Sequence, residues 1–336
     1  MISTATLPRQ IKSLVKPLLT PRVPKHISER FRSIDKTGMD AIEASLKSNF
    51  FSSEDSWYDD PLYLSSREVQ EDLKDHVYRR LDRFRQEVIP WLDSSKPLSK
   101  SSILEIGCGT GSSTVALAEQ GAEVIAIDIV ESSLIVAGDR CQVYDLKVDL
   151  LNANATEVPD IFSGQHFDFI IFFAALEHMT HHERIIAMKN TWDMLLPGGL
   201  WCVIETPNRL WYNDTHTSLL PFFSWLPDDL ALAYSQFSPR KRFNCLYREI
   251  NDDSKLDFLR RGRGVSYHEF ELTMKRAENL DVVSSLPIFL REQNPLRKVL
   301  WKMTIESRYE SLLAQIGPAI HRGFYQPFLD LIIKKD

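Results

Sequence analysis

Short apolar runs and helix-like stretches alternate along this chain, which predicts a mixed α/β protein. The apolar runs expected to form strands lie at residues 102–107, 123–128, 145–150, 167–173 and 200–205. Helices are expected between them, at residues 112–120, 131–140 and 181–195. Strands and helices that alternate in this order predict a parallel sheet with helices on both faces.

Segments on either side of this alternating core complete the expected fold. Before it, residues 66–92 carry apolar side chains at three- and four-residue steps, which indicates a helix that packs on the sheet. After it, residues 207–265 are rich in aromatics and show no clear strand, so we expect a helical cap inserted after the fifth strand. The remainder predicts a helix at 267–279, a strand at 281–290, a helical region at 296–320 and a last strand at 328–334.

A glycine-rich turn follows the first expected strand, in the pattern E-x-G-x-G-x-G at residues 105–111. Glycine lets the backbone adopt positive φ and approach a ligand closely. The second strand ends in Asp128, an acid that can hold the two hydroxyls of a ribose. These features predict a site for a nucleoside-containing cofactor. The dinucleotide fingerprint fails, because it needs Gly or Ala where this chain has Ser112.

The E-x-G-x-G-x-G pattern resembles motif I of the class I S-adenosylmethionine (SAM) methyltransferases. Residues 166–178 resemble the fourth strand of that family and its exit, and residues 195–205 resemble its fifth strand. These ordered matches cover roughly residues 101–207. The resemblance implies that SAM is the cofactor. It also implies a Rossmann-like, seven-stranded, mostly parallel sheet whose last two strands include the family's antiparallel pair.

The resemblance also implies which residues contact SAM. We expect Glu105 to help hold the methionine ammonium, directly or through water, and Asp128 to accept hydrogen bonds from the ribose. Asn154 stands where many family members have an Asp that contacts adenine. If the loop after the third strand aligns differently with the family, Asp149 is the alternative residue for this contact. The predicted cofactor contacts are Glu105, Gly107, Cys108, Gly109, Gly111, Asp128, Ile129, Asn154 and Phe173.

Three histidines are candidate bases that would take a proton from the methyl acceptor. His178 leaves the fourth strand at the edge where open α/β sheets bind ligands, although a hydrogen bond to a nearby loop explains it equally well. His216 lies in the expected cap, in a segment that resembles a cap element of some small-molecule methyltransferases. His268 ranks third, because a capping box of Ser266 and Glu269 already explains its neighbours. The available bases favour O-methylation over N- or C-methylation.

Composition and charge narrow the class of protein. The 336 residues are 43% hydrophobic and 26% charged, as in globular proteins, and the net charge of −6 argues against a general nucleic-acid binder. Four cysteines without C-x-x-C spacing argue against a disulfide framework or a metal site. No apolar run approaches the ~18 residues of a membrane span. We therefore expect a reducing, cytoplasmic setting, no metal and no transmembrane segment.

The chain is expected to divide into four regions. These are a basic, loosely ordered N-terminal arm and lid at 1–60, the SAM-binding core at 61–206, the substrate cap at 207–265, and the completion of the sheet with a helical insertion at 266–336. Residues 1–28 hold five basic residues and four prolines but no acid, and the prolines prevent a long helix. An organellar transit peptide is the alternative interpretation of this segment.

The sequence therefore predicts a SAM-dependent methyltransferase that acts on a small molecule. The aromatic residues of the cap indicate an acceptor with apolar or ring character. One alternative keeps the fold but acts on protein or RNA, and the acidic net charge weighs against it. Another is a non-catalytic scaffold subunit of the same fold. The resemblance does not identify the acceptor or the oligomeric state.

Overall fold

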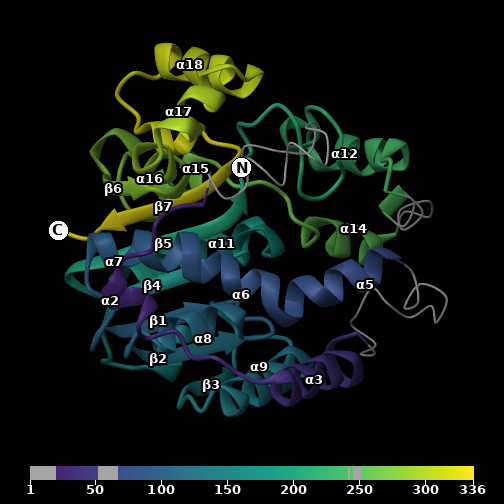
Figure 1. Cartoon of the computed structure of the whole chain (residues 1–336). Coiled ribbons are helices and arrows are strands. Elements are labelled where there is room, and N and C mark those ends of the chain that lie inside the picture. Colours follow the sequence, from purple (N-terminus) through teal and green to yellow (C-terminus); the bar gives the residue numbers. More distant parts are fainter. Residues whose placement is uncertain (1–19, 52–66, 241–242, 245–250) are drawn as a thin grey trace.

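Seven strands form one sheet in the computed structural model, which describes residues 20–51, 67–240, 243–244 and 251–336 (Figure 1). The strand order is β3-β2-β1-β4-β5-β7-β6, and β7 runs antiparallel to both of its neighbours. The strands are β1 (Ser102–Ile106), β2 (Glu123–Asp128), β3 (Asp149–Asn152), β4 (Phe167–Phe173), β5 (Leu195–Pro207), β6 (Asp281–Ser285) and β7 (Phe328–Lys334). This architecture confirms the predicted seven-stranded, mostly parallel sheet.

Alternate residues of each strand face opposite sides of the sheet, and each side is covered by helices. In β4, Phe169 and Ile171 belong to one apolar cluster, while Ile170 and Phe172 belong to the other. The first cluster is completed by α8 (Ser112–Ala118), α9 (Glu131–Val143) and the long helix at residues 67–95 that precedes the sheet, called the long N-terminal helix below. The second is completed by α10 (Val158–Ile161), α11 (His181–Asp193) and α15 (Tyr267–Thr273). Both faces are therefore buried, which explains the nearly continuous apolar runs of the central strands.

The helix expected at 66–92 runs from residue 67 to residue 95. It comprises α5 (Arg67–Lys74), η3 (Asp75–Arg79), α6 (Arg80–Arg83), η4 (Phe84–Val88) and α7 (Ile89–Ser95), where η3 and η4 are π-helical turns. Its apolar side chains, among them Leu81, Phe84 and Val88, pack in the first cluster. The predicted contact with the sheet is thus present.

The N-terminal arm differs from the loose segment that we expected, over the part that the structure describes. Residues 25–50 form α2 (Lys25–Ser28), α3 (Lys36–Ser45) and η2 (Leu46–Phe50). Ile27, Ile42 and Leu46 are buried in the first apolar cluster, and α3 packs against α9. Residues 1–19 and 52–60 of the predicted arm and lid lie outside the described part of the chain.

Residues 207–265 leave the sheet after β5 and form short helices. These are η6 (Phe223–Trp225), α12 (Asp228–Tyr234), η7 (Ser235–Phe237) and α14 (Asp252–Leu259). The segment buries a small cluster of its own, which consists of Leu220, Phe223, Ala231, Leu232, Phe243 and Phe258. In Figure 1, α12 and α14 lie on the side of the sheet to which the parallel strands point with their carboxyl ends.

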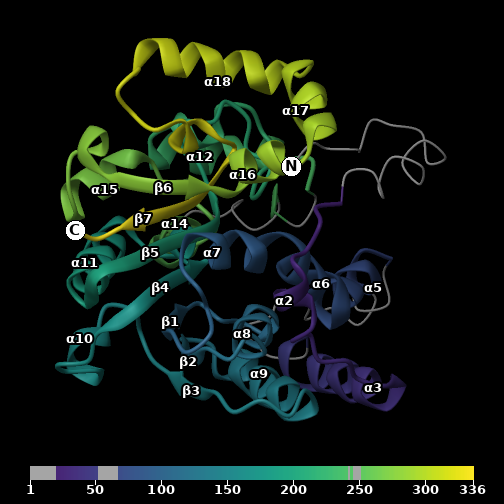
Figure 2. The same cartoon turned by 60° about the vertical axis from the view of Figure 1, so that its left-hand side comes forward.

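The C-terminal region returns to the sheet and carries a helical insertion (Figure 2). The strand expected at 281–290 ends at Ser285, because Pro287 cannot donate to a ladder and instead lies in the first turn of the next helix. The helices between β6 and β7 are α16 (Leu286–Gln293), α17 (Pro295–Lys302), α18 (Ile305–Ile316) and the 3₁₀ turn η9 (Arg322–Tyr325). Among the described residues, none of the helices has the length and apolarity to cross a bilayer.

Candidate functional site

The glycine turn between β1 and α8 forms an open cradle at its middle residue. Gly107 and Gly111 are packed tightly. A Cβ atom on Gly107 would lie 2.7 Å from the Ala175 Cβ, and one on Gly111 would lie 2.8 Å from the Ala137 Cα. A Cβ on Gly109 would meet nothing within 4 Å, and φ of Gly109 is +50°. The backbone therefore faces open space at Gly109, as it must if a ligand is to approach it closely.

Asp128 lies at the carboxyl end of β2, directly beside this cradle. Its Oδ2 accepts a hydrogen bond of 2.8 Å from the Gly109 amide, and its Oδ1 accepts one of 2.9 Å from the Val130 amide. Burial raises the pKa of Asp128, although these amides oppose the shift. Ile129 follows with 66% of its surface exposed, an apolar side chain held in the open next to a carboxylate. That pairing fits a ribose and the adenine ring attached to it.

Glu105 is fully buried beneath the cradle, in the middle of the sheet. The hydroxyls of Ser113 and Thr114, at the start of α8, both donate to its carboxylate, Thr114 at 2.6 Å. Burial raises the pKa of Glu105 to about 7, while the two hydroxyls act in the opposite direction. The observed partners join the strand to the helix, and the predicted contact with the methionine ammonium remains a prediction.

Two buried side chains that our sequence interpretation missed fix the glycine turn from behind. Arg140 of α9 donates to the carbonyl oxygens of Thr110, His76 and Val77, at 2.8 to 3.2 Å. His76 of η3 hydrogen-bonds the Thr110 hydroxyl at 3.1 Å. The long N-terminal helix is thereby tied to the turn, and carbonyl acceptors leave no pattern in a sequence that would reveal such ties.

The remaining predicted cofactor residues lie at the same edge of the sheet. Cys108 and Phe173 are buried, and the Phe173 ring packs edge-on against Phe84 at 5.0 Å. The Asn154 Oδ1 accepts hydrogen bonds from the amide and the hydroxyl of Thr156, so its NH₂ is the group that can donate to a ring nitrogen. The rival Asp149 begins β3 and therefore lies at the opposite edge from Asp128.

On the acceptor side, His178 closes the 3₁₀ turn η5 (Leu176–His178) that follows β4. Its Nδ1 lies 2.9 Å from the backbone carbonyl oxygen of Arg260. Because a carbonyl oxygen can only accept, Nδ1 carries the proton in this contact. A neutral His178 then offers its Nε2 lone pair as a proton acceptor.

His216 reaches the same place from the segment after β5. Its ring centroid is 6.2 Å from that of His178, and its Nδ1 lies 3.0 Å from the Thr217 hydroxyl oxygen. That hydroxyl donates to the Gly262 carbonyl oxygen at 3.0 Å, so it accepts from Nδ1 and leaves Nε2 of His216 unprotonated. Burial lowers the pKa of His216, and the nearby Glu177 carboxylate partly opposes this effect. Both histidines are therefore prepared to accept a proton at Nε2.

Glu177 supplies a buried carboxylate beside these histidines. Its Oε2 accepts a 3.0 Å hydrogen bond from the Thr206 hydroxyl, whereas its Oε1 has no hydrogen-bond partner in the described part of the chain. Arg184, also buried, holds this turn by donating to the carbonyl oxygens of Leu176 and Arg263, both at 2.6 Å. A buried carboxylate oxygen without a partner among the described residues can accept a hydrogen bond from a water or a ligand.

A second group of charges lies where β5 and β7 meet. Arg83 of the long helix forms an ion pair with Glu205, whose backbone amide donates to the Asp330 carboxylate at 2.7 Å. Glu205 adopts φ of +63°, a conformation that is strained for a residue with a side chain. Burial raises the pKa of Asp330 to about 6. Backbone strain of this kind gathers at functional sites.

His268, the third candidate base, lies on the outer surface of α15. Its side chain is 67% exposed, and its Nδ1 lies 3.2 Å from Oε2 of Glu271 on the same helix. The predicted capping box is present. The amide and the hydroxyl of Ser266 both donate hydrogen bonds to the Glu269 carboxylate. These contacts are those of a surface helix, and a role for His268 in catalysis remains a prediction.

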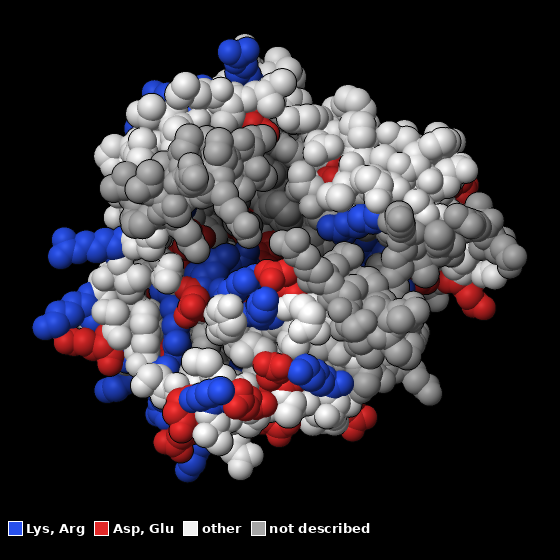
Figure 3. Space-filling model, turned by 45° about the vertical axis from the view of Figure 1, so that its right-hand side comes forward, with Lys and Arg blue, Asp and Glu red and all other residues white. Residues whose placement is uncertain are grey.

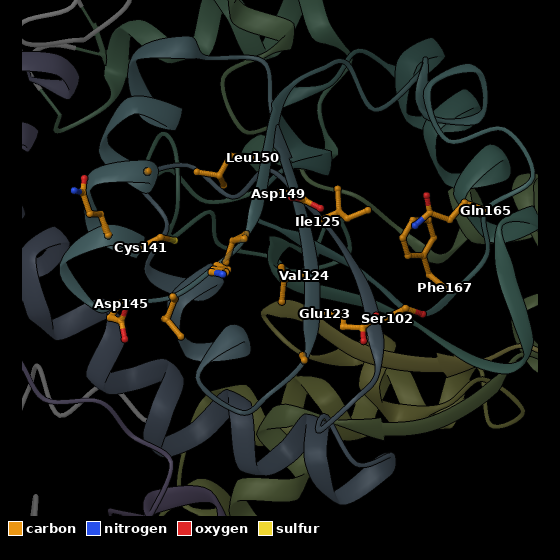
Figure 4. Close-up of a pocket in the computed structure, with 16 residues that line it drawn as sticks. Ser102, Glu123, Val124, Ile125, Cys141, Asp145, Asp149, Leu150, Gln165 and Phe167 are labelled. Atoms are coloured by element: carbon orange, nitrogen blue, oxygen red, sulfur yellow. The ribbon is translucent and has the colours of Figure 1, made fainter.

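A hollow lies at the other edge of the sheet, away from all of these residues. It has a volume of about 810 Å³ and opens at the amino ends of the strands, where Figure 4 shows Ser102, Glu123 and Asp149 on its walls. Parallel α/β sheets bind ligands at the carboxyl ends of their strands. We therefore assign the functional site to the region around Gly109, Asp128 and His178, not to this hollow.

Part of the chain is similar to known methyltransferases. Residues 103–199 match the family model described as a methyltransferase domain. The ubiquinone biosynthesis O-methyltransferase of Ruegeria pomeroyi is 30% identical over 118 residues, which are 35% of this chain and 46% of that relative. The demethylmenaquinone methyltransferase of Bacillus cereus is 29% identical over 171 residues, 48% of this chain and 68% of the relative. The chain thus spans less than half of the first of these relatives.

Among solved structures, the magnesium protoporphyrin IX methyltransferase of Synechocystis with bound SAM is similar to part of the chain. It is 20% identical, with a TM-score of 0.36, and the similarity covers 55% of this chain and 82% of that one. At this TM-score the structural similarity adds nothing to the case made by the family match.

Proposed function

Since residues 103–199 are a class I SAM-dependent methyltransferase domain, we propose that this chain methylates an oxygen atom of a small-molecule acceptor. The named relatives support the class of acceptor, because the Ruegeria pomeroyi relative is an O-methyltransferase of ubiquinone biosynthesis. On the face drawn in Figure 3, the described acidic and basic side chains are intermingled. That distribution favours a small acceptor over RNA, which binds to broad basic surfaces.

The residues at the carboxyl edge of the sheet fit SAM as the cofactor. When bound, SAM supplies an electrophilic methyl carbon attached to a sulfonium. Gly109 would let the backbone approach the cofactor, Asp128 would hold the ribose, and Ile129 would cover the adenine. The Asp128 carboxylate is held by two amides in the place that this role requires, which supports the assignment.

The observation that carries the proposal is the shared orientation of His178 and His216. In each ring, Nδ1 is engaged by a protein acceptor, and Nε2 is the nitrogen that can take a proton. The base would hold the proton that the acceptor hydroxyl gives up, which would leave the oxygen free to take the methyl group that SAM supplies. Glu177, whose Oε1 has no partner among the described residues, would stabilise the imidazolium that results at His216.

Single substitutions separate the cofactor half of the site from the acceptor half. We expect His178→Ala or His216→Ala to lower turnover by about 10²–10⁴-fold, whichever is the base, and to leave SAM affinity nearly unchanged. Asp128→Ala should weaken SAM binding at least ~100-fold, because the ribose loses two hydrogen bonds to a charged group. Turnover would be followed with labelled SAM and a metabolite extract, and affinity by calorimetric titration.

The pH profile identifies which histidine acts. A base must be unprotonated, so turnover rises with pH through its pKa. Burial lowers the pKa of His216 from 6.5, so an acidic limb below pH 6.5 that disappears in His216→Ala assigns the base to His216. Normal turnover in both histidine variants would contradict the proposal and would leave proximity to an already nucleophilic atom as the mechanism.

A further inference from the structure

The helical insertion between β6 and β7 carries a row of large apolar side chains on the outside of the molecule. On α17, α18 and the turn between them, the most exposed of these are Met303 at 77%, Ile316 at 74% and Ile305 at 65%. Val299 of α17 is 55% exposed, and Leu312 of α18 is 50% exposed. In Figures 1 and 2, α18 forms the outermost layer of the molecule on its side of the sheet.

These side chains follow the period of the helices and so form continuous stripes. Leu296 and Val299 of α17 and Met303, which directly follows it, are three and four residues apart. Ile305, Leu312 and Ile316 are seven and four residues apart on α18. The opposite face of α18 is occupied: Leu313 and Ala314 pack on the second apolar cluster, and Glu310 accepts a 2.9 Å hydrogen bond from Trp301. The exposed stripe is therefore additional to the face that holds the insertion on the sheet.

Basic side chains accompany this stripe in a chain that is acidic as a whole. Residues 295–316 contain four basic residues and two acidic ones, a net charge of +2, whereas the whole chain carries −6. Glu310, one of the two acids, is buried and lies 3.6 Å from Arg291. Lys298, Lys302 and Arg308 are exposed among the apolar side chains.

The stripe on α18 continues into aromatic residues of the segment after β5. Tyr309 lies on the same side of α18, between Ile305 and Leu312, and its ring contacts the ring of Tyr212 at 5.0 Å. The Tyr212 carbonyl oxygen accepts from the amide of Phe222, whose half-exposed ring lies 5.0 Å from that of Trp225. The aliphatic and basic side chains of the insertion are thus linked to these aromatic rings through Tyr309 and Tyr212.

We propose that this surface, formed by α17 and α18 with Phe222 and Trp225, docks on an anionic lipid bilayer. Aliphatic side chains would enter the acyl boundary, aromatic rings would lie at the level of the head groups, and basic side chains would meet anionic lipids. The net positive charge of the insertion favours a lipid surface over a second copy of this chain, which would present like charge to like charge. The proposal is independent of the methyl-transfer reaction proposed above.

Vesicle sedimentation tests the proposal with two variants of equal charge. The first variant combines Met303→Glu, Ile305→Glu and Ile316→Glu. The matched control combines Ile135→Glu, Ile161→Glu and Leu272→Glu, which replace exposed apolar residues on α9, α10 and α15. Each protein would be mixed with sucrose-loaded vesicles of phosphatidylcholine, with and without phosphatidylglycerol, after its melting temperature and SAM affinity show that it is folded.

We expect the unmodified chain and the control to bind vesicles that contain phosphatidylglycerol, and the first variant to bind at least ~10-fold more weakly. Added salt should weaken binding, because part of the attraction is between exposed charges. The proposal is overturned if the unmodified chain does not sediment with anionic vesicles, or if the first variant binds as well as the control. It is equally overturned if light scattering shows a dimer that only the first variant dissociates, since a second copy then covers the surface.

Discussion

At the scale of single residues, Glu105 shows how a buried charge can join two elements. A carboxylate in the middle of an apolar strand is costly unless it is hydrogen-bonded. Here the hydroxyls of Ser113 and Thr114 supply the two hydrogen bonds. Burial still outweighs them, because the pKa of Glu105 is raised to about 7.

This raised pKa predicts how stability depends on pH. The folded chain holds the Glu105 proton more tightly than the unfolded chain, in which the pKa is 4.5. The resulting stabilisation is therefore fully present below pH 4.5 and is lost as pH rises to about 7, a change on the order of 3 kcal/mol at most. Glu105→Gln, which cannot ionise, should lack this change.

The measurement is urea unfolding of both proteins at several pH values between 4.5 and 8. The free energy of unfolding of the unmodified chain should decline relative to that of Glu105→Gln over this range. Equal pH dependence in the two proteins would show that Glu105 ionises with an ordinary pKa.

The sequence revealed the need for partners at Glu105 but not their identity. The glycine spacing and Asp128 could be found because they follow from the demands of a ribose and a close backbone approach. Ser113 and Thr114 could not be found in this way, because which hydroxyls reach the Glu105 carboxylate depends on how α8 is placed over β1. Arg140 and Arg184 were missed for a related reason: their acceptors are backbone carbonyl oxygens, which every residue possesses.

At the scale of elements, the short loop at 260–264 connects both candidate bases. Arg260 supplies the carbonyl oxygen that engages His178, and Gly262 supplies the one that engages Thr217 beside His216. The arginines of this loop are themselves paired within the protein: Arg260 with Glu183, Arg261 with Asp257, and Arg263 with Asp228. The loop therefore acts as a support for the two rings.

Gly262→Ala should disturb this support. Gly262 has φ of +82°, and a Cβ there would lie 2.3 Å from the Thr217 hydroxyl oxygen and 2.9 Å from Nδ1 of His216. We expect turnover to fall at least ~10-fold while SAM affinity is retained, because the displaced ring belongs to the acceptor side.

Gly164→Ala is the matched control, because φ is +75° and a Cβ there meets nothing within 4 Å. Both variants introduce about 1–3 kcal/mol of backbone strain, which thermal unfolding would register. Turnover and SAM titration would then be compared. If Gly164→Ala loses as much turnover as Gly262→Ala, general destabilisation explains the loss and the loop has no special role.

Elements differed in how well the sequence predicted them. The apolar runs located β1, β2 and β4 to within one residue, because the sheet is covered on both faces there, whereas β3 begins four residues later and β5 five residues earlier than expected. β6 was overestimated, since its apolar residues continue past Ser285 into the helix that Pro287 begins. In the segment after β5, apolar residues do not recur at a helical spacing, so the sequence could not place its short helices.

At the scale of the whole molecule, the N-terminal region belongs to the fold from α2 onward. Ile27 is 1% exposed and packs in the cluster beneath the long helix, and His26 lies 3.0 Å from Asp93. A four-residue helix with one apolar side chain has no period that a sequence pattern could detect, so only the folded arrangement reveals the contact.

Ile27→Ala should therefore destabilise the whole domain. Loss of a fully buried isoleucine side chain costs about 2–5 kcal/mol. Met39→Ala, at an exposed position on α3, should change stability by less than about 0.5 kcal/mol. Urea unfolding of the three proteins measures both effects, and an Ile27→Ala variant as stable as Met39→Ala would show that α2 is not held on the core.

The separate apolar cluster of residues 207–265 has a consequence for how this protein can diversify. Under the proposed function this segment covers the acceptor, and substitutions within its own apolar cluster can alter the shape presented to the acceptor while the sheet keeps its packing. The residues expected to hold the cofactor all belong to the sheet and its turns, between Glu105 and Phe173. Under that proposal, acceptor preference can evolve, or be engineered, through the residues of this cluster while the residues expected to hold the cofactor remain constant.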